Sequence, residues 1–441
     1  MRARRWIVFG VLALALGLLT AACGGGDEEA APPAEPAPAE PAPPPAESAP
    51  AEPPAETAEP PADTGAAAEP TGEPIVIGAA MDLTGGMAPF DGAALASAQY
   101  EAEKLNAEGG VDGRPIQINV IDTQLDPEQT KSAAIDLIDN QGAQILFVTC
   151  DVDFAAPAIQ EALNRGVLAI APCIGTDQMG PQRFGEKGKL AFTLGNVAQD
   201  EGAAMAEFAL DQGWEKAIVI KDNLIVYFQD VVDAFAKRFA DNGGEVVQTE
   251  EYLNSIAGAE TGGTIQNVIS AVADTEADVI AISTAYDDLP ALVGGLRSLG
   301  VETPIICSWA CDGTYWNPEG LSNFYTVSYA SLVGDDPDDA VNTLVQTLTD
   351  EGTPPPTSSF VTGAAAIDAV AAAVQETGGT DGTALADVFE SFQGTPTISG
   401  AVTYSPELHG VTGREMRVMQ VQNGQLSFLE LRTASSPAEI R

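Results

Sequence analysis

Histidine and basic residues are scarce in this chain. Its 441 residues include one histidine and 19 lysines and arginines, against 64 aspartates and glutamates, which gives a formal net charge of −45. Residues 1–23 carry +3 and residues 24–74 carry −12, which leaves −36 for residues 75–441. Such a charge repels nucleic acid and anionic membrane surfaces, so neither is an expected partner of the folded part.

Catalytic and nucleotide-binding motifs are missing as well. The sequence contains no Gly-x-Ser-x-Gly, no Gly-x-Gly-x-x-Gly and no phosphate loop ending in Gly-Lys-Ser/Thr. The only histidine, His409, lies in a turn and is expected at the surface. Acidic pairs such as Asp151 and Asp153 arise by chance in so acidic a chain, so they argue only weakly for a glycosidase. We therefore predict a protein that is not an enzyme and needs no cofactor or metal.

The first 74 residues predict a targeting segment and a tether. Three arginines precede an apolar run over residues 6–19, which is short for a membrane-spanning helix and typical of a signal peptide. Small residues before Cys23 resemble a bacterial lipobox, so residues 1–23 predict a lipoprotein signal with Cys23 lipidated. Plain secretion and an uncleaved anchor are the alternatives. Residues 24–74, rich in Pro, Ala and Glu, predict a disordered, extended tether.

Four further cysteines lie in the remaining chain, and export would allow them to form disulfides. Cys150 and Cys173 follow predicted strands that could be neighbours, so they could pair. Cys307 and Cys311 could close a tight loop. Four cysteines allow three pairings, and free thiols or a metal site remain alternatives. A metal site is disfavoured because no cysteine lies near His409.

Strands and helices alternate along residues 75–431 without hairpin signals, which predicts an α/β fold with parallel sheets. The length suits two domains. In the first half, strands are predicted at 75–80, 116–121, 144–148 and 167–171, helices at 93–107, 127–140 and 155–165, and an extended link at 190–194. In the second half, strands are predicted at 217–220, 245–247, 278–282 and 304–306, with helices at 227–242, 263–274 and 289–299. The remaining predictions are helices at 337–350, 359–376 and 382–392, and strands at 324–327, 401–404, 417–421 and 427–431.

The turns that follow predicted strands suggest a binding site. In an open parallel sheet, the carboxyl ends of the strands face the ligand crevice. The turns at 150–154 and 173–176 are therefore expected to form its floor. Six aromatic residues also fall at or just after predicted strand ends and could supply apolar walls: Phe90, Phe154, Tyr227, Tyr286, Trp309 and Tyr315.

Residues 75–431 resemble the branched-chain amino acid-binding type of bacterial solute-binding protein, which serves ABC importers. The resemblance rests on the order and spacing of short segments, namely 77–79, Thr84-Gly85, 106–116, 122–127, the Cys150 turn, 167–172, Lys221-Asp222 before Tyr227, and 296–300. It implies a periplasmic binding protein type I fold, with two Rossmann-like lobes of parallel-sheet core joined by three hinge crossovers. The implied boundaries are 75–194 plus 329–400 for lobe 1, 195–328 plus 401–431 for lobe 2, and 432–441 for a C-terminal tail.

The resemblance also implies which residues hold a ligand. In the family, the turns after the third and fourth strands bind the ligand's carboxylate, aromatic residues flank it, and further groups contact its ammonium end. Carried over, the predicted ligand-binding residues are Phe90, Cys150, Asp151, Asp153, Phe154, Ile174, Thr176, Tyr227, Tyr286 and Asp312.

One departure bears on the ligand. Where the family offers small hydroxyl residues to a carboxylate, this chain offers Asp151 and Asp153. Two like charges ~4 Å apart repel by about 4 kcal/mol at an effective dielectric constant of about 20. An inward-facing aspartate would favour a cationic, amide or hydroxyl-bearing ligand. If both aspartates point outward, backbone N–H groups could still bind a carboxylate.

The resemblance thus implies a monomeric, extracytoplasmic protein anchored to the cell membrane by an N-terminal lipid. It is expected to capture a small polar molecule, such as an amino acid or amide, between its lobes and to deliver it to an ABC permease. A ligand-sensing receptor of the same fold and a secreted hydrolase are the alternatives.

Overall fold

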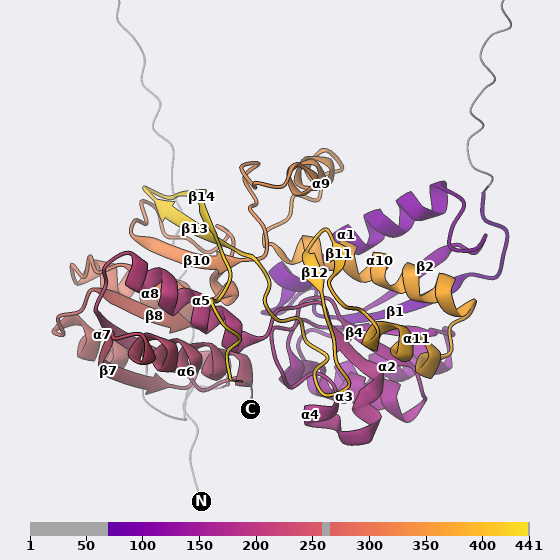
Figure 1. The fold of residues 1–441 in the computed structure, drawn as a ribbon, viewed down its shortest axis with the longest axis horizontal. Coiled ribbons are helices and arrows are strands. Elements are labelled where there is room, and N and C mark those ends of the chain that lie inside the picture. The colour runs from indigo at the N-terminus through magenta and orange to yellow at the C-terminus, as the bar shows by residue number, and fades with distance from the viewer. Residues whose placement is uncertain (1–68, 258–264, 440–441) are drawn as a thin grey trace, which may run out of the picture. The chain divides into compact units, whose positions relative to one another are not determined.

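The computed structural model describes residues 69–257 and 265–439. The expected signal segment, the lipidation site Cys23 and most of the tether lie outside these residues. Among the described residues, strands form a five-stranded sheet and a seven-stranded sheet, which are the cores of what we call lobe 1 and lobe 2 (Figure 1). No described helix is both long and apolar enough to cross a bilayer.

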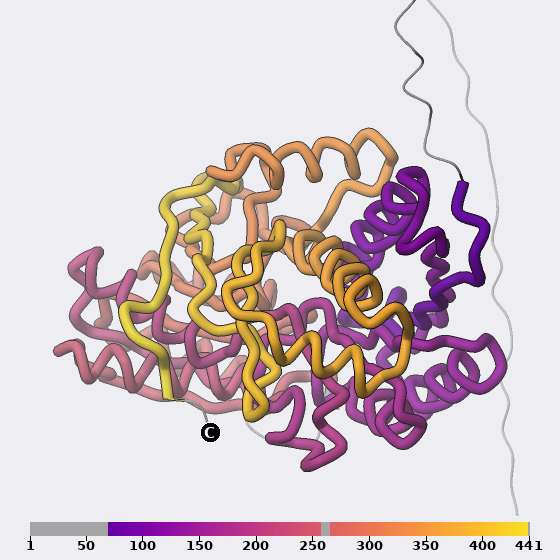
Figure 2. Tube along the Cα trace, turned by 45° about the vertical axis from the view of Figure 1, so that its right-hand side comes forward, coloured from indigo at the N-terminus to yellow at the C-terminus, as the bar shows by residue number. Residues whose placement is uncertain are grey.

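The sheet of lobe 1 is parallel throughout, because every connection between its strands returns the chain to the same end. Its spatial order is β2 (Ile116–Asp122), β1 (Ile75–Met81), β3 (Ile145–Val148), β4 (Leu168–Ala171) and β5 (Ala191–Thr193). Its helices are α1 (Ala88–Ala107), α2 (Pro127–Asp139), α3 (Val152–Asn164), α4 (Pro181–Phe184), η1 (Gly185–Leu190), α10 (Ser359–Thr377) and α11 (Gly382–Glu390). Helices α1 and α10, far apart in sequence, lie side by side (Figure 1, Figure 2).

The sheet of lobe 2 is parallel from β7 to β10 and ends in two antiparallel strands. Its spatial order is β14 (Gln425–Arg432), β13 (Met416–Gln422), β10 (Phe324–Ser328), β9 (Ile305–Cys307), β8 (Val279–Ser283), β6 (Lys216–Asp222) and β7 (Glu245–Tyr252). Its helices are α5 (Ala198–Asp211), α6 (Val226–Asp241), η2 (Ser255–Ala257), α7 (Ile265–Ala273), α8 (Asp288–Ser298) and η3 (Trp309–Cys311). Helix α9 (Asp339–Asp350) follows β10, and β11 (Thr395–Thr397) pairs with β12 (Gly400–Val402).

Buried apolar side chains form three clusters that explain this layering. One fills the space between the lobe 1 sheet and helices α2 and α3, and a second lies between the lobe 2 sheet and helices α7 and α8. The third covers the opposite faces of both sheets and continues from one lobe into the other. Full burial on both faces accounts for the continuous apolar runs of strands such as β3 and β8, because parallel sheets are covered by helices on both sides.

The chain passes between the described sheets after β5, after β10 and before β13, which confirms the predicted type of α/β fold. Three local predictions differ from the structure. Helix α1 begins at Ala88 rather than at residue 93, because Pro89 suits the first helical turn. The segment 190–194 is extended as predicted, but it is not merely a link, since it contains β5, which pairs with β4. The predicted strand at 401–404 is not part of the lobe 2 sheet, since β12 pairs with β11.

The segment that follows β12 also packs differently from the prediction. The hydroxyl of Tyr404 donates to the carbonyl of Thr193, and the carbonyl of His409 accepts from the Thr193 amide, so this segment covers the edge of β5 in lobe 1. His409 is fully buried rather than exposed, with its ring stacked on Phe192 at 3.9 Å between centroids. The lobe 2 boundary that was predicted at residue 401 therefore lies further along the chain.

Candidate functional site

A small cavity lies where the two lobes meet at the carboxyl ends of their strands. Lobe 1 contributes Met87, Phe90, Cys150, Asp151, Val152, Ile174, Gly175 and Thr176, and lobe 2 contributes Ile225, Tyr227, Phe228, Ala285, Tyr286, Trp309 and Ala310. The space open to the centre of a water-sized sphere is about 20 Å³. That is little more than one water needs, so a larger occupant requires the lobes to part or the walls to move.

Seven of the ten predicted ligand-binding residues line this cavity: Phe90, Cys150, Asp151, Ile174, Thr176, Tyr227 and Tyr286. The other three, Asp153, Phe154 and Asp312, do not line it. Phe154 packs its half-buried ring against the apolar cluster shared by the lobes. Asp312 is fully buried and accepts hydrogen bonds from the Ser328 hydroxyl at 2.9 Å and from the Gly313 amide at 2.8 Å. Its carboxylate therefore stabilises the turn after η3.

Several lining residues were missed by the sequence reasoning. Trp309, one of the six aromatic residues at strand ends, lines the cavity although it is not among the predicted ligand-binding residues. Other missed lining residues follow a strand and lie close in sequence to predicted residues, namely Met87, Ile225 and Phe228. Their position after a strand could have identified them as lining residues.

Asp151 caps helix α3 and faces the cavity. Its Oδ1 accepts the amide hydrogens of Asp153 at 2.9 Å and Phe154 at 3.1 Å, as expected of an N-cap aspartate. The residue is 3% exposed. Burial, and then the nearby charge of Asp153, raise the pKa of Asp151 to about 7.

Asp153 points away from the cavity and joins the two lobes. Its Oδ1 pairs with Arg183 of lobe 1 at 2.7 Å, and its Oδ2 accepts the amide hydrogen of Val226 at 2.9 Å. Val226 is the first residue of helix α6 in lobe 2, and the N-cap residue Ile225 offers no side-chain acceptor. A side chain of lobe 1 thus caps a helix of lobe 2.

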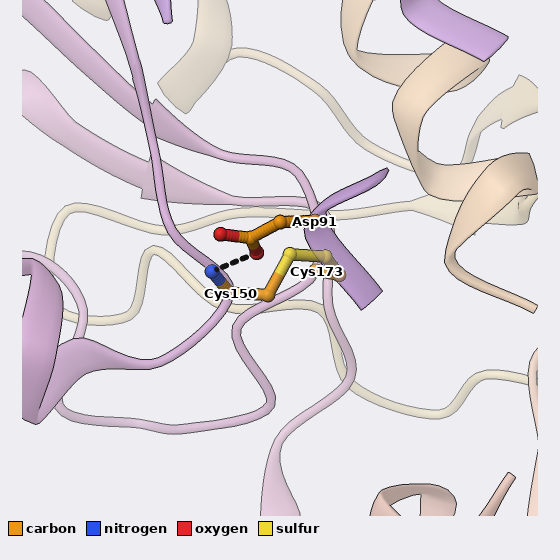
Figure 3. Close-up of side chains that lie close together, drawn as sticks. All are labelled: Asp91, Cys150 and Cys173. Atoms are coloured by element: carbon orange, nitrogen blue, oxygen red, sulfur yellow. Dashed lines mark hydrogen bonds between the residues drawn. A yellow bond between two sulfur atoms is a disulfide. The ribbon is translucent and has the colours of Figure 1, made fainter. Parts of the chain in front are cut away.

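A disulfide forms part of the cavity floor. It joins Cys150, after β3, to Cys173, after β4, with 4.9 Å between the Cα atoms (Figure 3). Asp91 of helix α1 lies against it and accepts the amide hydrogens of Cys150 at 2.8 Å and Asp82 at 2.7 Å. Burial raises the pKa of Asp91 to about 8. Although Asp91 and these sulfur atoms lie within 4.8 Å of one another, the disulfide removes the thiolates that a metal ion would need.

Two tyrosines of lobe 2 fit against glycines of lobe 1. A Cβ at Gly175 would lie 2.7 Å from Cε2 of Tyr227, and a Cβ at Gly86 would lie 2.5 Å from Cδ1 of Tyr286. Tyr286 also donates its hydroxyl hydrogen to the sulfur of Met87 at 3.3 Å. Its backbone is left-handed, with φ of 61°, an uncommon conformation for an aromatic residue that often marks functional positions.

A buried polar cluster lies behind the aromatic wall, where the lobes are connected. Glu201 accepts hydrogen bonds from the hydroxyls of Tyr227 at 2.6 Å and Tyr329 at 3.3 Å and from the amide of Trp309 at 3.3 Å. The guanidinium of Arg414 lies 4.7 Å from the Tyr329 ring centre. Burial raises the pKa of Glu201 to about 8 in spite of these donors.

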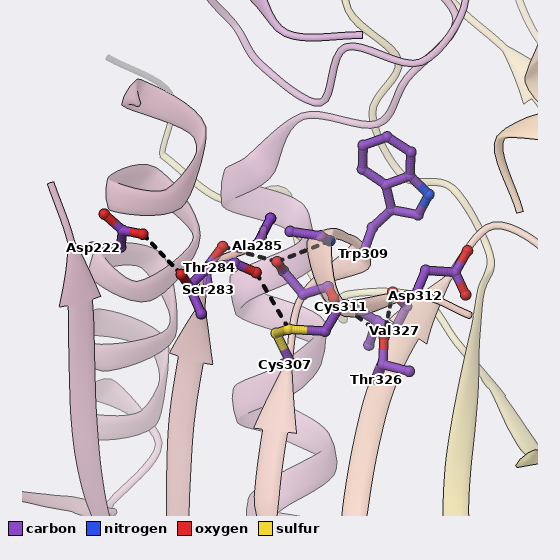
Figure 4. Close-up of a disulfide and its surroundings, with 12 residues drawn as sticks. Asp222, Ser283, Thr284, Ala285, Cys307, Trp309, Cys311, Asp312, Thr326 and Val327 are labelled. Atoms are coloured by element: carbon purple, nitrogen blue, oxygen red, sulfur yellow. Dashed lines mark hydrogen bonds between the residues drawn. A yellow bond between two sulfur atoms is a disulfide. The ribbon is translucent and has the colours of Figure 1, made fainter. Parts of the chain in front are cut away.

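The second disulfide lies in lobe 2, and its two cysteines flank Trp309 in the sequence. It joins Cys307 at the end of β9 to Cys311 in η3, with 5.9 Å between the Cα atoms (Figure 4). The bridge closes the short turn that carries Trp309 and Ala310, both of which line the cavity. It therefore helps to hold one aromatic wall in place.

Comparisons with known proteins agree with this architecture. The model of a family described as periplasmic binding protein matches residues 74–425. The Leu/Ile/Val-binding protein of Escherichia coli K12 is 19% identical over 260 residues, which span 59% of this chain and 64% of that protein. The Leu/Ile/Val-binding protein BraC3 of Rhizobium johnstonii is 23% identical over 367 residues, 81% of this chain and 94% of that protein.

Two solved structures show the same fold. The branched-chain amino acid transporter substrate-binding protein LivJ from Streptococcus pneumoniae, in complex with isoleucine, superposes with a TM-score of 0.71 and 19% identity, covering 82% of this chain and 100% of that one. A solute-binding protein of an ABC transporter from R. palustris, in complex with benzoate, superposes with a TM-score of 0.68 and 18% identity. The match covers 83% of this chain and 98% of that one.

Proposed function

Because the chain belongs to the periplasmic binding protein family, we propose that it captures a small polar solute between its lobes and delivers it to an ABC importer in the membrane. The observation that carries the proposal is the cavity, whose walls come from the strand ends of both lobes. A site built from two lobes opens and closes as they move, which allows a solute to be held and then released.

The cross-lobe contacts support this role. Asp153 reaches the amide of Val226, and Tyr286 reaches Met87, so polar contacts between the lobes lie beside the cavity. We further propose that Cys23 carries the lipid that anchors the chain outside the cytoplasm. Solute binding without turnover follows, because solutes delivered to an importer must remain intact.

A thermal-shift screen of amino acids, amides, urea-like compounds and polyols tests the function. A solute present at about 100 times its Kd should stabilise the protein by about 2.7 kcal/mol. Chromatography of the solute after incubation should recover it unchanged. The proposal is refuted if no class of solute raises the melting temperature or if a bound solute is consumed.

Anchoring is tested separately by replacing Cys23 with alanine in the producing bacterium. The wild-type protein should sediment with membranes, and the variant should be lost from them. Absence of the wild-type protein from the membrane fraction would refute lipidation at Cys23.

A further inference from the structure

The carboxylate of Asp151 has an oxygen without a partner inside the cavity. Its Oδ1 accepts both of the amide hydrogen bonds at the start of α3, whereas no hydrogen bond from residues 69–257 or 265–439 reaches its Oδ2. The residue is 97% buried and lines the cavity. This oxygen borders the cavity space, so a donor or a positive charge from an occupant would stabilise the ionised carboxylate there.

The same arrangement disfavours an anionic occupant. The amide groups of Asp153 and Phe154, which form the positive end of helix α3, are already used by Asp151. Among the described residues that line the cavity there is no lysine, arginine or histidine. Arg183, a basic group whose charge acts on Asp151, is paired with Asp153 outside the cavity. A carboxylate placed beside Asp151 would therefore meet a like charge without compensation.

Aromatic rings supply the rest of the wall. Phe90 and Trp309 lie edge to face at 4.8 Å between ring centres, and Tyr227 lies at 6.3 Å from Trp309 in a similar T-shaped arrangement. Phe228 and Tyr286 form a further T-shaped pair at 6.4 Å. Aromatic rings attract cations through their negative faces, and the attraction grows when water is excluded. A carboxylate combined with an aromatic enclosure is the chemistry that recognises an alkylated ammonium group.

We infer that the cavity selects a small alkylammonium cation that carries no carboxylate, with its nitrogen beside Asp151 and its alkyl groups against the aromatic rings. The inference rests on the proposed solute-binding function and specifies its ligand class. It differs from the amino acids named for the relatives, because no basic side chain among the described residues lines the cavity to balance a free carboxylate on the ligand.

Isothermal titration of the purified protein tests the inference. The probes are propylammonium and tetramethylammonium as cations, propionamide as a neutral compound, and leucine as a zwitterion. At least one cation should bind at least tenfold more tightly than propionamide and leucine. Asp151→Asn should weaken that cation at least tenfold, because asparagine keeps the capping oxygen but removes the charge.

The matched control is Asp126→Asn, which makes the same change at the N-cap of helix α2. Asp126 accepts the amide hydrogen of Gln129 at 2.8 Å and does not line the cavity. This variant should bind the cation as the wild type does, so a loss confined to Asp151→Asn reports the charge and not the cap. Circular dichroism of both variants confirms that they are folded before titration.

The pH dependence of cation binding supplies a second readout. A cation prefers ionised Asp151, so its affinity should fall about tenfold between pH 8 and pH 6 as that group takes up a proton. The charged groups that act on it are Asp153 on α3 and Arg183 on α4, while Tyr286 before α8 is subject to the charges of both Asp151 and Asp91 of α1. Protonation of Asp91 would also weaken cation binding as the pH falls. The change of affinity between pH 8 and pH 6 is therefore measured in Asp151→Asn too, where it should be smaller.

Three outcomes are distinguishable. Tight cation binding that depends on Asp151 supports the inference. Tighter binding of leucine or propionamide, or cation binding unchanged in Asp151→Asn, overturns the inference and leaves the solute-binding function standing. Failure of these probes and of every solute in the thermal-shift screen overturns both.

Discussion

Removing the disulfides one at a time should destabilise the protein to different extents. The perturbation is a pair of double variants, Cys150→Ala with Cys173→Ala, and Cys307→Ala with Cys311→Ala. All four sulfur atoms belong to buried residues, so the loss of side-chain volume is nearly matched between the two variants. What differs is the length of chain that each bridge closes.

The magnitude follows from loop-closure entropy. The bridge Cys150–Cys173 spans a sequence separation of 23, for which the constraint on the unfolded chain is worth about 3.4 kcal/mol at 25 °C. The bridge Cys307–Cys311 spans a separation of 4, worth about 1.9 kcal/mol. The first double variant should therefore be less stable than the second by about 1.5 kcal/mol, since the similar volume losses cancel.

Equilibrium unfolding in urea, followed by far-UV circular dichroism, measures the difference. Removal of a bridge also lets the unfolded chain expand and can steepen the transition, so each free energy of unfolding is taken from both the midpoint and the slope. An equal loss in both variants, or a larger loss for Cys307 and Cys311, would refute loop closure as the main source of stabilisation. Unfolding of the wild type under reducing conditions is the control. Because the reduced protein keeps all four sulfur atoms, it should lose only the two loop-closure contributions, and so less than the sum of the two variants' losses.

Two further predictions concern the groups around the cavity. Burial raises the folded-state pKa of Glu201 to about 8, so its contribution to stability is present at pH 4 and is lost as the pH rises toward 8. Glu201→Gln should therefore reduce the fall of the unfolding free energy with pH by about 1 kcal/mol per pH unit, measured by urea unfolding between pH 5 and pH 8. An unchanged pH dependence in this variant would contradict a protonated Glu201. Gly175→Ala places a methyl group 2.7 Å from Tyr227 and should oppose closure by about 1–3 kcal/mol, seen as about 5- to 150-fold weaker binding of the tightest solute in titration. Gly92→Ala, where a Cβ meets nothing within 4 Å, is its control and should bind normally; equal affinities in the two variants would show that the Gly175 contact does not limit closure.

Much of the fold could be predicted because its determinants are local. Buried parallel strands appear in the sequence as short apolar runs such as Ile145–Val148, and the alternation of strands with amphipathic helices limits the connections. The turns after these strands also gave the approximate site, since Cys150, Ile174 and Tyr227 all lie at strand ends.

Side-chain direction could not be predicted in the same way. Asp151 and Asp153 are two residues apart, yet one faces the cavity and the other faces a helix of the opposite lobe. The choice depends on Arg183 and Val226, which are 30 and 73 residues away from Asp153. His409 was misplaced for a similar reason, because its burial depends on the edge strand β5, which the sequence did not reveal.

The bond between Asp153 and Val226 gives helix α6 an unusual dependence on the other lobe. An N-cap contributes about 1 kcal/mol to the stability of a helix, and here the capping oxygen belongs to a different sheet and moves with it. If the lobes separate as the proposed function requires, the first amide of α6 is left to water, and the opening would then loosen the first turn of this helix in lobe 2. Hydrogen exchange at the Val226 amide therefore measures closure of the lobes. It should be slow in the closed protein and fast in the open one.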